Sequence, residues 1–105
     1  MSRTLLQRRL IDVSDRLKRL RAELAVSDEQ VAFFEAEADD ARLRSLVSET
    51  PLADAEAREV RRHADAQARQ REGLRRAVRE LESEQDALLD RMAKELATTD
   101  RETSR

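Results

Sequence analysis

Apolar residues recur along two stretches of this sequence at alternating intervals of four and three. In the first half, ten of the eleven positions in this rhythm are apolar: Leu6, Leu10, Val13, Leu17, Leu20, Leu24, Ser27, Val31, Phe34, Ala38 and Ala41. In the second half nine of twelve are apolar: Ala53, Ala57, Val60, Ala64, Gln67, Arg71, Leu74, Val78, Leu81, Gln85, Leu88 and Met92. A spacing of 3.5 residues is typical of helices that wind around a partner helix. We therefore expect two long helices, and we call each of these sets of positions the seam of its helix.

The composition agrees with an all-α fold. Ala, Glu, Lys, Leu and Arg together supply 64 of the 105 residues, more than the roughly 50% that is typical of long helices and coiled coils. The chain has one glycine, one proline and 2% aromatic residues, which argues against a β-rich or α/β enzyme.

The boundaries of the two helices follow from residues near Pro51. Proline cannot continue an incoming helix but suits the first position of an outgoing one, and Thr50 can cap that helix. At the front, Thr4 and Gln7 have the spacing of a capping box. We predict one domain over residues 1–105, with a helix at 4–47, a turn at 48–50, a helix at 51–97 and a frayed tail at 98–105.

A turn this short makes the two helices antiparallel, and the charges agree. Residues 1–25 carry a net charge of +4, residues 26–60 carry -7, residues 61–79 carry +5 and residues 80–105 carry -4. Antiparallel helices place each basic block beside an acidic one, whereas parallel helices would place like charges together. The sequence therefore predicts a long antiparallel two-helix coiled-coil hairpin.

The predicted register places Leu17 beside Leu81 and Phe34 beside Ala64. It also places Ser27 near Arg71, which makes a polar layer in the seam. Such a layer can fix the register of a continuous helix. Alternatively, the capping-box pattern that begins at Ser27 marks a hinge where the helix restarts. Both alternatives stay open.

Five large apolar residues of the first helix lie off its seam. They are Val26, Phe33, Leu43, Leu46 and Val47, and we call them the outer patch. They lie on the opposite side of the helix from the seam, and a large exposed apolar surface usually marks an interface. We expect two hairpins to dimerise there into a four-helix bundle. A different protein partner is one alternative, and scattered surface residues without a function are another.

The sequence offers little for catalysis or metal binding. Without cysteine and with one histidine, it cannot form a structural zinc site, and one glycine excludes a glycine-rich phosphate loop. His63, expected to face Glu37, is predicted to be a flanking polar residue. Glu35, Glu37, Asp39 and Asp40 diverge by about 100° per residue, so we predict a solvated acidic face. We expect no enzyme activity, catalytic residue, metal, cofactor or small-molecule substrate.

Nucleic acid and membrane are not expected partners either. The basic run Arg69, Arg71, Arg75, Arg76 and Arg79 lacks aromatic stacking residues and faces an acidic block. The chain contains no apolar run of 18 residues, and its first ten residues have no signal-peptide core. These features predict a cytoplasmic protein.

Two stretches resemble known families. Residues 9–17, with Pro51 and the later run at 58–60, are similar to the all-helical chorismate mutases. That family uses several cationic side chains, including a lysine of the long first helix, around a dicarboxylate. In this sequence the lysines are Lys18 and Lys94 alone. The region that would correspond to the third helix of that family is too polar to pack inside its bundle.

The segment from Glu49 to Glu56 looks like the acidic tips of coiled-coil hairpins that enter the secondary channel of bacterial RNA polymerase. This resemblance implies that Glu49 and Asp54 act in a larger machine, although the tip motif and the anchoring domain of that family are not found in these residues. The overall pattern of two seams around Pro51 most resembles small coiled-coil proteins of actinobacteria, which have no assigned biochemical activity.

Overall fold

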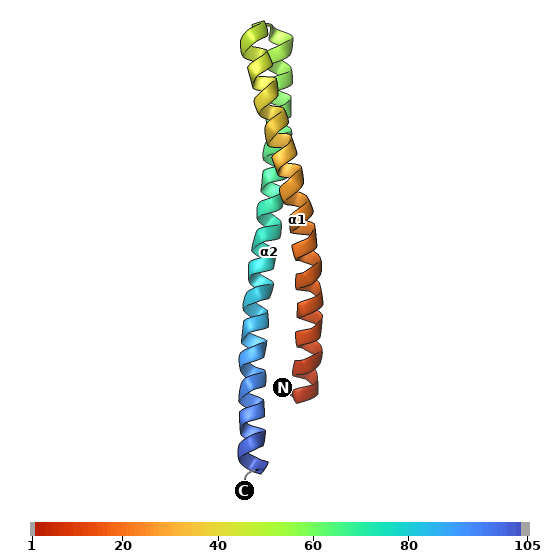
Figure 1. The fold of residues 1–105 in the computed structure, drawn as a ribbon, viewed down its shortest axis with the longest axis vertical. Coiled ribbons are helices and arrows are strands. Elements are labelled where there is room, and N and C mark those ends of the chain that lie inside the picture. Colours follow the sequence, from red (N-terminus) through yellow and green to blue (C-terminus); the bar gives the residue numbers. More distant parts are fainter. Residues whose placement is uncertain (1, 104–105) are drawn as a thin grey trace. The chain divides into compact units, whose positions relative to one another are not determined.

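The computed structural model describes residues 2–103, which form two long helices (Figure 1). Helix α1 spans Arg3–Ser48 and helix α2 spans Pro51–Thr103. The two helices run antiparallel and are joined by a two-residue turn. The described residues contain no strand, so the predicted all-α helical hairpin is confirmed.

Backbone contacts divide the chain into two compact units. The first unit combines the part of α1 up to Arg21 with the part of α2 from Arg76 onward, and the second is Ala22–Arg75, which includes the turn. Helix α1 continues without interruption through Ser27, so the helix does not restart there.

The seams form the interior of both units. All eleven seam positions of α1 and all twelve of α2 are buried or half-buried. Their apolar side chains leave water together because the 3.5-residue repeat keeps them on one side of each helix.

Branched aliphatic side chains fill the core of the first unit. The buried ones are Leu6, Val13 and Leu17 of α1, with Val78, Leu81 and Leu88 of α2. The polar seam residue Gln85 is satisfied because its Nε2 donates a hydrogen bond to Ser14 Oγ at 3.0 Å. Arg9 pairs with Glu84 at 2.6 Å, which links the basic start of α1 to the acidic end of α2.

Smaller side chains fill the core of the second unit. Its buried residues are Ser27, Val31, Ala38, Ala41 and Ala64. Phe34 is half-buried, and its ring lies edge-on to His63 with 4.4 Å between the ring centroids. His63 directly precedes Ala64, so Phe34 lies within one residue of its predicted neighbour.

The turn has the predicted cap. Glu49 adopts the left-handed backbone conformation with φ 51°, and its N–H donates to the Ser45 carbonyl at 3.0 Å. The Thr50 hydroxyl accepts a hydrogen bond from the Ala53 N–H at 3.2 Å. Thr50 therefore caps α2, and Pro51 is its first residue, as expected for a proline that has no N–H to pair.

The ends of α1 differ slightly from the prediction. The helix starts at Arg3 instead of Thr4, and its cap is Ser2, whose Oγ accepts a hydrogen bond from the Leu5 N–H at 3.2 Å. Ser2 directly precedes the first helical residue, which is where a hydroxyl can reach an unpaired amide, whereas Thr4 already lies inside the first turn. At the other end, α1 extends one residue further than predicted, to Ser48.

Helix α2 continues to Thr103 instead of ending at Ala97. The predicted frayed tail at 98–105 is therefore wrong for residues 98–103, while residues 104–105 lie outside the described residues. A helical segment satisfies its own backbone groups without burying a side chain. Two threonine hydroxyls of this segment also donate to carbonyls one turn earlier, each at 3.0 Å.

Candidate functional site

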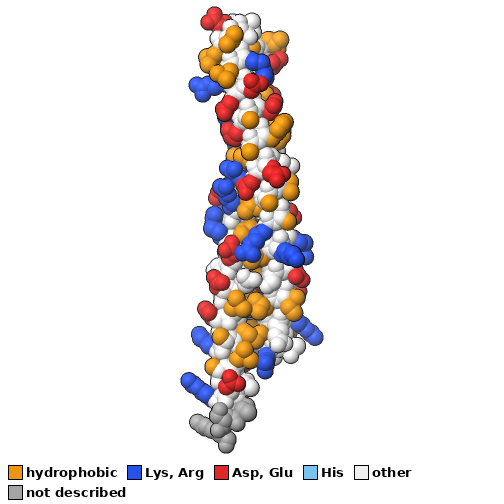
Figure 2. Space-filling view, viewed as in Figure 1, with side chains coloured by type: hydrophobic (Ala, Val, Ile, Leu, Met, Phe, Trp, Pro, Cys, Tyr) orange, Lys and Arg blue, Asp and Glu red, His pale blue; other side chains and the backbone are white. Residues whose placement is uncertain are grey.

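All five residues of the outer patch are exposed. The exposed fraction is 54% for Val26, 60% for Phe33 and 86% for Val47, with Leu43 and Leu46 between the last two values. All lie on α1 within the second unit, on the side that helix geometry places opposite the seam. Figure 2 shows apolar side chains at the surface near the turn, interspersed with charged ones. Helix α2 therefore leaves this face uncovered.

The residues of the outer patch, except Leu46, belong to a longer heptad pattern on the outside of α1. Steps of four and three from Ala22 pass through eight exposed positions, which we call the outer ladder: Ala22, Val26, Glu29, Phe33, Ala36, Asp40, Leu43 and Val47. Six of the eight are apolar. The sequence-based prediction included the patch but not Glu29 and Asp40, which occupy the polar positions of this second 3.5-residue repeat.

Phe33 is the first of three rings that adjoin one another. Its ring lies edge-on to Phe34, with 5.3 Å between the centroids, and Phe34 lies edge-on to His63. The seam is thus connected to the outer patch through adjoining rings. His63 and Glu37, which were predicted to be neighbours, line the same shallow hollow of about 280 Å³.

Carboxylates surround the outer ladder. Residues 22–47 of α1 contain seven acidic side chains and two arginines, a net charge of -5. One of the arginines, Arg44, donates a hydrogen bond to Asp40 one turn before it. The outer face of α1 is therefore an apolar stripe on an acidic helix.

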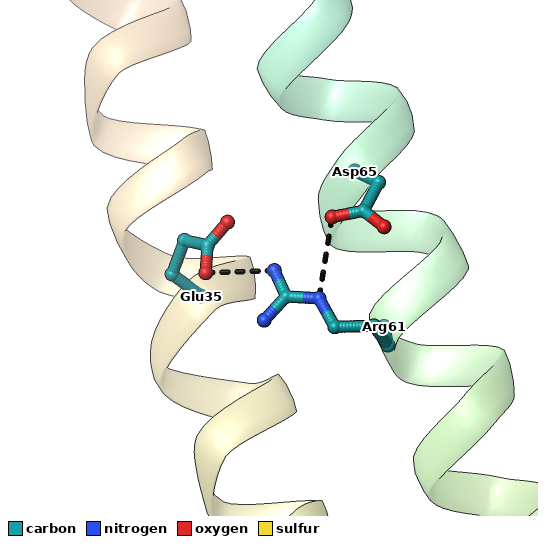
Figure 3. Close-up of polar contacts among 3 residues, drawn as sticks. All are labelled: Glu35, Arg61 and Asp65. Carbon is teal, nitrogen blue, oxygen red and sulfur yellow. Dashed lines mark hydrogen bonds and ion pairs between the residues drawn. The ribbon is translucent and has the colours of Figure 1, made fainter.

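The inner side of the same helix has its carboxylates paired with α2. Arg61 Nη2 lies 2.7 Å from Glu35 Oε2, and Arg61 Nε lies 3.2 Å from Asp65 Oδ1 (Figure 3). Asp28 lies 3.9 Å from Arg71 and 3.7 Å from Arg75. A guanidinium group held between two carboxylates is thus one way in which this chain joins its helices.

Two side chains have shifted pKa values. The hydrogen bond to Glu35 raises the pKa of Arg61 above its ordinary value, so Arg61 stays charged at any physiological pH. The hydrogen bond from Arg62 lowers the pKa of Glu59. A lowered carboxyl pKa favours the folded state above the unfolded pKa, and this contribution is lost as the pH falls through the folded value. Both groups serve as ion-pair partners in the fold.

The two predicted tip residues have different surroundings. Asp54 accepts a hydrogen bond from the Ser45 hydroxyl, which ties the start of α2 to the end of α1. Glu49 lies in the turn itself, and its side chain is exposed. Asp54 therefore has a structural role in the turn, whereas Glu49 points its charge toward solvent.

A hollow lined by arginines is a weaker candidate site. An arginine-lined hollow of about 410 Å³ near the turn includes Arg61 and Arg62, and both already pair with carboxylates of the chain. Residues 2–103 contain no group of three or more acidic or histidine side chains that could hold a metal ion.

No protein family, no curated protein and no solved structure matches this sequence. Within the described part of the chain, neither helix has a stretch long and apolar enough to cross a membrane.

Proposed function

We propose that this protein is a non-enzymatic, cytoplasmic interaction or scaffold module that self-associates through the outer patch. The observation that carries the proposal is the exposure of all five patch residues on one side of α1. Two hairpins that meet through these faces would form a four-helix bundle in which the outer ladder acts as a further seam.

The small core of the second unit supports this proposal. Three of its five buried residues are alanines, whereas the first unit buries four leucines and two valines. Burial contributes about 25 cal/mol per Å² of apolar surface, and small domains have little of it to spare. A second copy on the outer patch would add large apolar side chains where the hairpin has few.

Sedimentation of matched variants tests self-association. The wild-type protein is expected to be a dimer at micromolar concentration, and Phe33→Glu is expected to be a monomer because it buries a carboxylate in the interface. Leu89→Glu is the control, since Leu89 is also exposed but lies on α2 in the first unit. Equal monomeric behaviour of the wild type and Phe33→Glu would contradict the proposal.

A second candidate function places the turn in a larger machine. The supporting observation is Glu49, whose exposed carboxylate lies in the tight turn. The variants Glu49→Gln and Asp54→Asn remove charge while keeping size, and the asparagine still accepts the hydrogen bond from Ser45. Loss of cellular activity at an unchanged melting temperature would favour this function, whereas loss with Phe33→Glu alone would favour the patch.

A further inference from the structure

We infer that the occupant of the outer ladder is a second copy of this chain in an antiparallel arrangement. In this arrangement Phe33 faces the partner's Ala36, and Val26 faces the partner's Leu43. The inference rests on the proposed self-association and specifies how the two outer ladders meet.

The order of residues in the outer ladder supports this pairing. Its two polar members, Glu29 and Asp40, lie equally far from the midpoint between Phe33 and Ala36. A two-fold axis at that midpoint therefore places polar residues opposite polar ones and apolar residues opposite apolar ones. It also brings Phe33 against a small residue, the partner's Ala36, and large against small is how cores fill space without overlap.

Other alignments of the same faces bury a carboxylate against apolar side chains. A shift of one heptad in one direction sets Glu29 against the partner's Phe33, and a shift in the other sets it against the partner's Val47. An unpaired carboxylate in apolar surroundings is strongly unfavourable. A parallel pair would instead place Glu29 beside the partner's Glu29, with no basic residue within one turn of either. The antiparallel alignment about the midpoint avoids the first cost, and its like-charged layer of Glu29 and Asp40 has Arg44 one turn away.

Arg44 provides the charge complementarity in the layer where Glu29 and Asp40 meet. Glu29 would face the partner's Asp40, and two carboxylates alone would repel. The partner's Arg44 already binds that aspartate from one turn away and lies diagonally across from Glu29. The resulting trio has the composition of the one that Arg61 forms with Glu35 and Asp65 inside the hairpin (Figure 3).

A basic helix from another protein is the rival occupant, because residues 22–47 carry a net charge of -5. Charge alone would attract such a helix. However, binding of a basic helix gives no reason for the symmetric placement of Glu29 and Asp40 about the midpoint of the outer ladder. The two occupants also respond in opposite directions to the loss of Arg44.

Disulfide crosslinking tests the pairing directly, since the natural chain has no cysteine. In the double variant with Val26→Cys and Leu43→Cys, the two thiols of one chain lie about 25 Å apart along α1 and cannot join. In the proposed dimer each thiol faces the partner's other cysteine. Mild oxidation is expected to yield a covalent dimer on a non-reducing gel.

Each single variant serves as a matched control. The thiol of Val26→Cys alone would lie about 25 Å from its counterpart in the partner, so this variant is expected to stay uncrosslinked, and Leu43→Cys likewise. If the wild type sediments as a dimer that Phe33→Glu dissociates, but the double variant does not crosslink, the pairing is wrong while self-association stands. If no dimer forms at all, both proposals fail.

Arg44→Gln separates a second copy from a basic partner. It would leave Glu29 facing the partner's Asp40 without a cation, twice per dimer, so we expect the dimer Kd to rise about two- to thirtyfold. An unchanged or lower dimer Kd would overturn the inference. Tighter binding of Arg44→Gln to a synthetic basic amphipathic helix, with no dimer in sedimentation, would identify the rival occupant instead.

Discussion

Ser27 is a buried polar residue of the seam. The predicted register places it near Arg71, and Arg71 lies 3.9 Å from Asp28, the next residue of the chain. Ser27 is 4% exposed, and its hydroxyl has no hydrogen-bond partner. Leaving a buried hydroxyl unpaired costs about 1–3 kcal/mol. The hydroxyl of Ser14, a half-buried serine beside the seam, instead accepts a hydrogen bond from Gln85. The two serines therefore have opposite effects on stability.

The substitution of each serine by alanine should change stability in opposite directions. Ser27→Ala is expected to raise the free energy of unfolding by about 1 kcal/mol, because it removes an unpaired polar group. Ser14→Ala is expected to lower it by about 0.5–1.5 kcal/mol, because it removes the partner of Gln85. Urea unfolding followed by circular dichroism measures both. A destabilising Ser27→Ala would mean that this hydroxyl is bonded in solution.

At the scale of the elements, the two helices approach each other through different side chains in the two units. Leucines and valines separate them in the first unit, whereas alanines dominate the buried positions of the second. Ala64 has an exposed fraction of 0%, so no space remains around its methyl group for a longer side chain. The alanine-rich stretch of α2 is therefore a steric requirement of the second unit.

A larger residue at Ala64 should consequently destabilise the hairpin. Ala64→Leu is expected to lower the free energy of unfolding by about 1–3 kcal/mol, because overpacking forces the helices apart. Ala55→Leu, at an exposed position of the same helix, is expected to change it by less than about 0.5 kcal/mol. Thermal unfolding compares the two variants. Equal melting temperatures would show that the helices can separate at Ala64 without cost.

For the molecule as a whole, the predicted charge blocks determine the ion pairs between helices. In the first unit Arg9 pairs with Glu84 and Arg21 approaches Glu82 at 4.0 Å. In the second unit acidic residues of α1 pair with arginines of α2, as Glu35 does with Arg61. Such exposed pairs contribute little energy each, so they orient the helices while apolar burial stabilises them.

Self-association should couple the stability of the hairpin to its concentration. If the dimer buries the outer patch, mass action raises the melting temperature of the wild type as the protein is concentrated. Phe33→Glu is expected to melt at a temperature independent of concentration. Differential scanning fluorimetry with an external dye over a hundredfold concentration range measures this difference. A concentration-independent wild type would contradict the dimer.

The sequence by itself determined the two helices, their antiparallel orientation, the seam residues, the cap at Thr50 and the exposure of the outer patch. These features depend on periodicity, on one proline and on blocks of charge, all of which are properties of the chain before it folds. Only the tertiary structure decided that Ser2 caps α1, that Asp54 binds Ser45, that Arg61 lies between two carboxylates and that Ser27 is left unpaired. Each of these depends on which side-chain atoms come within about 3 Å of each other, and residue spacing alone does not specify that distance.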